Sequence, residues 1–159
     1  METVRHLVQQ LAIYEKEPDG VNVTAKDYQL DGGSEEPIFY CILADVKDGD
    51  DDATTTTTKT IGMGFFFFAF DSSGEGRFLY LDDLFVEEEH RGKGAGKGIM
   101  ELLAHIALSM ECCKFVWTAL DWNTPALQFY ERIGAEQKTD LKITRYCDEA
   151  LKSFATQQL

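Results

Sequence analysis

The chain has little positive charge and no long apolar run. Lysine and arginine together number 15 against 28 aspartates and glutamates, so the formal net charge is −13. Nucleic acids and anionic membranes reward clustered Lys and Arg, so we expect neither as a partner. The most apolar run, residues 61–70, is far shorter than the ~20 residues needed to span a bilayer.

Metal and disulfide spacings are also missing. The four cysteines contain no CxxC pair, and the three histidines form no cluster with metal-ligand spacing. Free thiols in a reducing compartment explain such cysteines. With no recognisable signal peptide, we expect a cytoplasmic protein that holds no metal.

What the sequence does contain is enough apolar material for one core. Hydrophobic residues make up 44% of the 159 positions and aromatic residues 12%. This length suits a single domain over residues 1–159. The acidity would steer a cationic ligand toward the protein, or it only aids solubility.

Periodicity predicts alternating helices and strands. Helices are expected at about 4–12, 24–33, 99–110 and 124–133 and after Asp148, and strands at about 38–46, 61–70, 77–86, 115–120 and 141–147. Residues 47–60, which include five consecutive threonines, are expected to form a mobile loop. Hairpins combined with crossover helices favour an α/β fold with a mixed sheet.

A glycine-rich segment at 91–98 lies between the expected strand at 77–86 and the expected helix at 99–110. Glycines let the backbone come close to a ligand, and free N–H groups at a helix start face an anion. This arrangement predicts a site for a phosphate-bearing molecule.

The spacing of the glycines excludes two common phosphate motifs. A dinucleotide fingerprint counted from Gly92 would place Lys97 where its third glycine belongs. A P-loop would need a glycine at Arg91 and a Ser or Thr in place of glycine after Lys97. The pattern that fits is Arg-x-x-Gly-x-Gly, formed by Arg91, Gly94 and Gly96. A flexible turn beside a helix start is the alternative.

This pattern resembles the pyrophosphate loop of the GNAT acetyltransferases, which hold acetyl-CoA. Leu-Asp-Trp-Asn at 120–123 and Phe-Tyr-x-x-x-Gly-Ala at 129–135 resemble the second half of the same domain. A narrower resemblance, to the spermidine/spermine N1-acetyltransferase branch with its thialysine N-acetyltransferases, rests on segments 11–15, 37–41 and 79–83. Together these motifs extend over most of the chain.

The resemblance implies a GNAT fold, with a mixed, mostly antiparallel central sheet flanked by helices. Members of that family open with a strand before their first helix. Here the first expected helix begins almost at Met1, so that strand is missing. An exposed sheet edge can pair with another chain, and the family's habit implies a homodimer.

The resemblance also implies where acetyl-CoA binds. Strand backbone at 84–86 would meet the pantetheine arm, and the glycine loop would hold the pyrophosphate. The expected cofactor-contacting residues are Leu84, Phe85, Val86, Arg91, Gly92, Lys93, Gly94, Ala95, Gly96, Lys97, Asn123, Thr124, Pro125, Ala126 and Tyr130.

The implied reaction is acetyl transfer to a primary amine by direct attack. Tyr130 matches the general acid that protonates the leaving thiolate, or it is simply an aromatic core residue. Asp82 stands where the family has Glu, as a base or a cation anchor. Strand alternation predicts that Asp82 and Asp83 face opposite sides. The alternative is that both lie at an exposed strand end.

Tyr14, Glu15 and Asp82 match positions that contact the substrate. Trp122 would be a cation–π wall beside the amine, or would pack in the core. The segment at 136–140 is short and contains a lysine, which disfavours a long polycation such as spermine. A small cationic amine is therefore expected, either thialysine or a lysine-like amino acid, or a diamine. A non-catalytic acetyl-CoA-binding module and a protein N-acetyltransferase are the alternatives.

Overall fold

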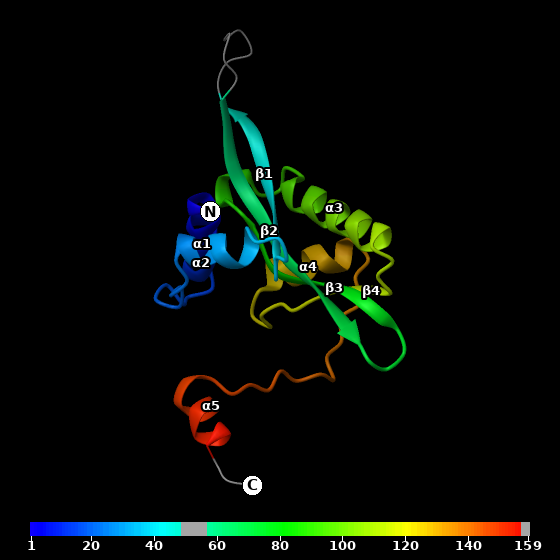
Figure 1. Ribbon diagram of the computed structural model, residues 1–159. Helices are drawn as coiled ribbons and strands as arrows, with labels where there is room; N and C mark the ends of the chain where they lie inside the picture. The colour runs from blue at the N-terminus through cyan, green and yellow to red at the C-terminus, as the bar shows by residue number, and fades with distance from the viewer. Residues whose placement is uncertain (49–56, 157–159) are drawn as a thin grey trace. The chain divides into compact units, whose positions relative to one another are not determined.

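A four-stranded mixed sheet organises the first part of the chain (Figure 1). The structure is a computed structural model that describes residues 1–48 and 57–156, in two units, Met1–Leu120 and Asp121–Leu159. The first unit contains, in order, α1 (Glu2–Tyr14), α2 (Ala25–Gly32), β1 (Tyr40–Asp48), β2 (Thr57–Asp71), β3 (Gly76–Val86), the 3-10 helix η1 (Glu88–His90), α3 (Ala95–Ser109) and β4 (Lys114–Trp117). The second unit contains α4 (Thr124–Arg132) and α5 (Asp148–Ala155).

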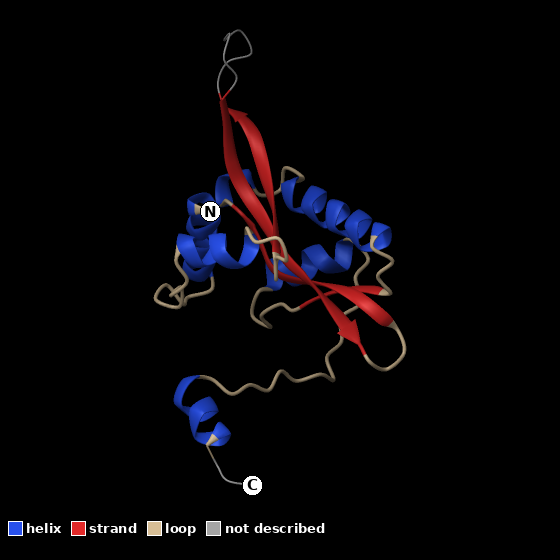
Figure 2. Cartoon of the chain, viewed as in Figure 1, coloured by secondary structure: helices blue, strands red, loops and turns tan. Residues whose placement is uncertain are grey.

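The strand order is β1-β2-β3-β4, with β1 at an edge of the sheet. β1 and β2 pair antiparallel, as do β2 and β3, whereas β3 and β4 pair parallel. Figure 2 shows β1 and β2 as a long hairpin that extends beyond the helices of this unit. The predicted α/β class and the mixed, mostly antiparallel sheet are confirmed.

Helices cover both faces of this sheet. On one face, Leu7 and Leu11 of α1 pack with Met63 and Phe85 in a buried cluster. Leu7 is 1% exposed and Met63 0%, and burying such a side chain contributes about 1.5–3 kcal/mol. On the other face, α3 approaches so closely that a Cβ at Gly64 would lie 2.7 Å from Ile99. Glycine at this position therefore allows α3 to pack against β2.

α2, within the helix expected at about 24–33, begins at a capping box formed by Thr24 and Asp27. The Thr24 hydroxyl accepts a hydrogen bond from the Asp27 N–H at 3.3 Å, and the Asp27 carboxylate accepts one from the Thr24 N–H at 2.8 Å. Tyr28 is buried and packs edge-on against Phe39 and Phe65, each with ring centroids 6.0 Å apart. The cap and this aromatic contact fix α2 beside β2.

A β-bulge interrupts the pairing of β2 with β3. Phe65 pairs with Asp83 and Phe66 with Leu81, so Asp82 is an extra residue on β3. A bulge disrupts the strict alternation of side chains and increases the local twist. The bulge falls on the two aspartates that the sequence singles out.

Several predicted boundaries are wrong. The expected mobile loop at 47–60 is wrong at both ends, because β1 continues through residue 48 and β2 begins at residue 57; for residues 49–56 the prediction lies outside the described residues. α3 begins at Ala95, inside the glycine-rich segment. Residues 141–147, expected as a strand, pair with none of the described strands and have no regular structure. A strand of a sheet needs a neighbour that bonds to its backbone N–H and C=O groups.

The last helix begins at Asp148 with Cys147 as its N-cap, so Asp148 is the first helical residue rather than the cap. Within residues 1–48 and 57–156, no helix combines the length and apolarity needed to cross a membrane.

Candidate active site

The glycine-rich turn leads directly into the N-terminus of α3. Gly92 has φ +73° and Gly94, the N-cap, has φ +96°, a left-handed conformation that favours glycine. The Gly98 N–H donates to the Gly94 carbonyl at 2.9 Å, which is the first turn of the helix. Helix geometry leaves the N–H groups before Gly98 without helical acceptors, at the positive end of the dipole. This turn can bind an anion through its backbone.

The Arg91 side chain ties this turn to β3 and α1. Its Nε donates a hydrogen bond to the Val86 carbonyl at 2.8 Å. Its guanidinium lies 4.7 Å from the Tyr14 ring centroid and 5.6 Å from that of Phe85. Arg91 thereby holds the loop in position, while Lys97 forms an ion pair with Glu101. Anion contacts in this structure would come first from backbone N–H groups.

β3 offers free backbone beside this turn. Its pairing with β4 runs only from Phe78 with Lys114 to Leu81 with Trp117. Beyond Leu81, no described strand pairs with β3 on the β4 side. On that side, no described strand pairs with the backbone from Asp82 to Phe85, whereas the Val86 carbonyl accepts the Arg91 hydrogen bond; cofactor contact by Leu84, Phe85 and Val86 stays a prediction.

An acidic cavity of about 370 Å³ lies between α1, α2 and the strands. Four of its lining residues are aspartates, Asp27 and Asp31 on α2 and Asp82 and Asp83 on β3. Apolar side chains, Phe65 among them, form much of the remaining wall. Among the described residues, no lysine, arginine or histidine lines it. Its charge fits a small cation with an apolar body.

The two aspartates of β3 are harder to ionise than an ordinary carboxylate, whereas hydrogen bonds with Thr24 lower the pKa of Asp27 on α2. The pKa of Asp83 is raised to about 7, first by burial and then by the charges of Asp82 and Glu15. Burial also raises the pKa of Asp82. The pKa of Glu15 is raised by burial and by Glu17 and Asp82. Such a cluster is stabilised by a bound cation or by a proton.

Asp83 is a site residue that the sequence reasoning missed. Simple strand alternation predicted that it faces away from Asp82, yet both aspartates line the same cavity. The reason is the bulge, which adds Asp82 to β3 opposite Phe65 and Phe66. An acidic pair inside an otherwise apolar strand was the available signal, because buried carboxylates are costly without a role.

The two substrate positions at the end of α1 are separated by the structure. The Glu15 carboxylate is close enough to Asp82 and Asp83 to influence their charges. Tyr14 instead lines a second cavity, of about 660 Å³, together with Arg91 and Phe85. Glu15 therefore lies near the aspartates of the acidic cavity, and Tyr14 lies beside Arg91, which anchors the glycine turn.

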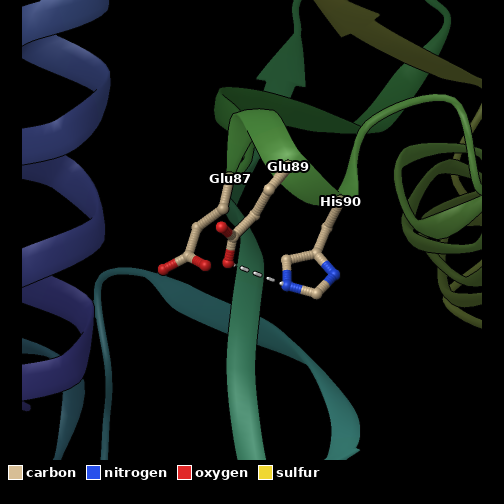
Figure 3. Close-up of side chains that lie close together, drawn as sticks. All are labelled: Glu87, Glu89 and His90. Atoms are coloured by element: carbon tan, nitrogen blue, oxygen red, sulfur yellow. Dashed lines mark ion pairs between the residues drawn. The ribbon is translucent and has the colours of Figure 1, made fainter.

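Three side chains of the β3–α3 connection lie close together in Figure 3. Glu87, Glu89 and His90 each present a potential ligand atom, all within 4.8 Å of one another. The Lys59 ammonium bonds to Glu87 at 2.7 Å and to Glu89 at 2.9 Å. A metal ion would have to displace this lysine, and the ion pairs instead hold β2 against the connection.

The second unit contains the remaining predicted residues. Asn123 caps α4 by accepting a hydrogen bond from the Ala126 N–H at 3.4 Å, with Pro125 in the first turn. Tyr130 is 8% exposed and its ring centroid lies 5.3 Å from that of Phe129. Trp122 is 42% exposed, which disfavours the core-packing alternative for this residue.

Sequence and structural comparisons agree with this geometry. The family model "Acetyltransferase (GNAT) family" matches residues 6–135. A thialysine N-epsilon-acetyltransferase of Sus scrofa is 31% identical over 155 residues, which cover 96% of this chain and 89% of that protein. The human spermidine/spermine N(1)-acetyltransferase-like protein 1 is 30% identical over 132 residues, 83% of this chain and 18% of that protein.

A solved structure has the same architecture. An integron cassette protein from the mobile metagenome of V. cholerae superposes with a TM-score of 0.74 at 26% identity, covering 97% of this chain and 90% of that one. The chain belongs to the GNAT acetyltransferase family.

Proposed function

We propose that the protein, acting as one domain, transfers the acetyl group of acetyl-CoA to a primary amine of a small cationic substrate. The observation that carries this proposal is the acidic cavity, because four aspartates without a basic residue among its described lining suit an ammonium group. Membership of the family implies acetyl-CoA as the cosubstrate.

The cofactor would lie along β3 and end at α3. Its pantetheine arm would meet the β3 backbone at 84–86, where Arg91 already bonds to the Val86 carbonyl, and its pyrophosphate would meet the N–H groups of the turn at 92–97. The segment at 123–126, which starts α4, is the further proposed contact. No metal enters this proposal.

Chemistry would proceed by direct attack of the neutral amine on the thioester carbonyl. Tyr130 is the proposed general acid for the departing thiolate, supported by its match to the family motif and by its burial. The aspartates of β3 would bind the ammonium and help it to lose a proton. Because the amine attacks the thioester itself, no acyl-enzyme forms.

Two observations bear on the choice of amine. The relative from Sus scrofa is a thialysine acetyltransferase, which favours a lysine-like amino acid. The cavity offers no described basic side chain to pair with an α-carboxylate, which favours a diamine. Its volume of about 370 Å³ suits either small amine better than a protein tail.

The test is acetyl-CoA consumption with a panel of acceptors, namely thialysine, lysine, putrescine, spermidine and a histone-tail peptide. We expect a small amine to give the highest kcat/KM. Turnover with the peptide alone would favour a protein acetyltransferase. Tight acetyl-CoA binding with no turnover on any acceptor would favour a non-catalytic binding module and overturn the proposal.

A further inference from the structure

We propose that Asp83, rather than Asp82, takes the proton from the substrate ammonium, and that Asp82 holds the ammonium in place. This inference rests on the acetyl transfer proposed above and assigns the two carboxylates of its cavity separate roles. It moves the base one residue along β3 from the position that the sequence pattern suggests.

The bulge gives the two carboxylates different surroundings in one cavity. Asp83 remains in register with Phe65 and is half-buried, whereas Asp82 is the extra residue and is exposed. Both line the cavity. Burial raises the pKa of both carboxylates, but the more exposed Asp82 is better solvated and is the weaker base, while the more shielded Asp83 accepts a proton more readily. Position therefore favours Asp83 as the proton acceptor.

The charged groups around Asp83 make it a still stronger base than Asp82. Asp82 of β3 and Glu15 of α1 add negative charge. Burial, and then the charge of Asp83, raises the pKa of both Tyr28 on α2 and Cys41 on β1, so both side chains lie near Asp83. The positive charge of Arg5 acts on Tyr28 in the opposite direction.

The acidic cavity also contains Asp27 and Asp31 of α2. Within the described part of the chain, no hydrogen bond or ion pair satisfies the carboxylate of Asp82 or Asp83. A general base works best when its pKa lies near the operating pH, and the pKa of Asp83 is raised to about 7.

The proton balance of the reaction fits one acceptor. The ammonium loses one proton to Asp83, and the neutral nitrogen forms the N–C bond to the thioester carbonyl. When the C–S bond breaks, the thiolate receives the proton of Tyr130. The nitrogen releases its second proton, which restores the Tyr130 phenol, and Asp83 returns its proton to solvent. The products are an N-acetyl amine, CoA thiol and one proton.

The experiment compares Asp83→Asn and Asp82→Asn over a range of pH with the amine that the wild-type enzyme uses best. Asp45→Asn serves as a control, because Asp45 is an exposed carboxylate on β1 outside the described cavities. Acetyl-CoA affinity by calorimetry and the melting temperature verify that each variant is folded. The readouts are kcat, the KM for the amine and the pH profile of kcat/KM.

We expect Asp83→Asn to lower kcat by ~10²–10⁴ and to remove the inflection near neutral pH. Asp82→Asn should chiefly raise the KM for the amine, and its inflection should move to lower pH because a neighbouring negative charge is gone. Asp45→Asn should resemble the wild type.

The reverse pattern, with the kcat loss in Asp82→Asn and an unchanged profile in Asp83→Asn, would overturn the assignment while leaving the acetyltransferase proposal intact. Wild-type protein inactive on every amine would overturn both. The two failures are therefore distinguishable.

Discussion

At the residue scale, Asp82 and Asp83 show how one extra residue in a strand changes electrostatics. The bulge opposite Phe65 brings two carboxylates to one cavity, where burial raises the pKa of both and the charges of Asp82 and Glu15 raise that of Asp83 further. An unpaired carboxylate in such a place costs folding free energy whenever it is ionised. A cationic ligand bound in the cavity would offset this cost in folding free energy.

This cost gives a prediction for stability. The folded-state pKa of Asp83, about 7, exceeds its ordinary value of 3.8, so the folded protein binds the extra proton between these values. Stability from this group is therefore present at low pH and lost as the pH rises through the folded-state pKa. Asp83→Asn should raise the melting temperature relative to wild type at about pH 9, the gain should be well under half as large at about pH 5, and it should vanish only below the ordinary pKa of 3.8. The corresponding free energy is at most on the order of 4 kcal/mol.

Thermal unfolding at the two pH values measures this effect without any substrate. An equal change at both values would mean that Asp83 is already ionised and solvated in the folded state. Asp45→Asn is again the matched control, because it removes an exposed carboxylate.

Tyr130 gives a second prediction at this scale. Tyr130→Phe keeps the buried ring but removes the phenolic proton, so kcat should fall by ~10²–10⁴. Acetyl-CoA affinity should hardly change, because the ground state makes little use of that proton. Steady-state kinetics with calorimetry separates the two effects. Full activity would assign protonation of the thiolate to water instead.

At the scale of elements, the N-terminus of α3 is the proposed anion site. Gly96 lies in the first turn without a positive φ, so a side chain there keeps the backbone unstrained. Gly96→Leu should still fold but should keep the pyrophosphate away from the N–H groups, weakening acetyl-CoA binding at least tenfold, about 1.4 kcal/mol. Calorimetric titration with CoA measures the loss.

Gly98→Leu is the control for this change. Gly98 is on the same helix with nothing within 4 Å of an added Cβ, and its N–H already bonds to Gly94. Unchanged affinity in Gly96→Leu, or an equal loss in both variants, would remove the anion site from this turn.

The elements themselves were largely predictable, and the details that position the site were not. The 3.6-residue stripe of α1, the Thr24 cap and the apolar runs of β2 and β3 are local signals, and each gave an element of the predicted type. The bulge at Asp82 depends on pairing with β2, so no local pattern reveals it. Residues 141–147 have strand-like composition, but a strand needs a neighbour to complete its hydrogen bonds.

In the candidate site, too, local motifs were predictable and contacts between distant segments were not. The glycine spacing located the turn before α3, and the structure supplies its left-handed Gly94. The anchoring of Arg91 on Tyr14 and the placement of Asp82 and Asp83 in one cavity depend on contacts between distant segments, so the acidic pair was visible in the sequence but its arrangement was not. The roles of the predicted cofactor-contacting residues stay predictions.

At the scale of the whole molecule, charge and sheet edges matter most. The net charge of −13 attracts cations over distances that salt shortens, so the acidic cavity lies within a favourable field. β1 forms an outer edge of the described sheet, with Tyr40 41% and Leu43 41% exposed. An edge of this kind offers unpaired backbone groups to another strand.

We therefore predict a homodimer in solution. Sedimentation velocity at micromolar concentration should show a species of twice the chain mass. Replacing Leu43 on β1 with lysine should weaken that species, because a charge on an edge strand opposes pairing. A single monomeric species in the unmodified protein would refute the prediction.

The most direct test of the central claim follows the acetyl group itself. Isotope-labelled acetyl-CoA is mixed with the purified protein and its best small amine, and the masses of amine and protein are measured together during turnover. The account predicts that the label appears on the amine nitrogen at the rate of CoA release, with no labelled protein at any time. Label that accumulates on the protein first, or that is released only as free acetate, would contradict direct transfer to a small amine.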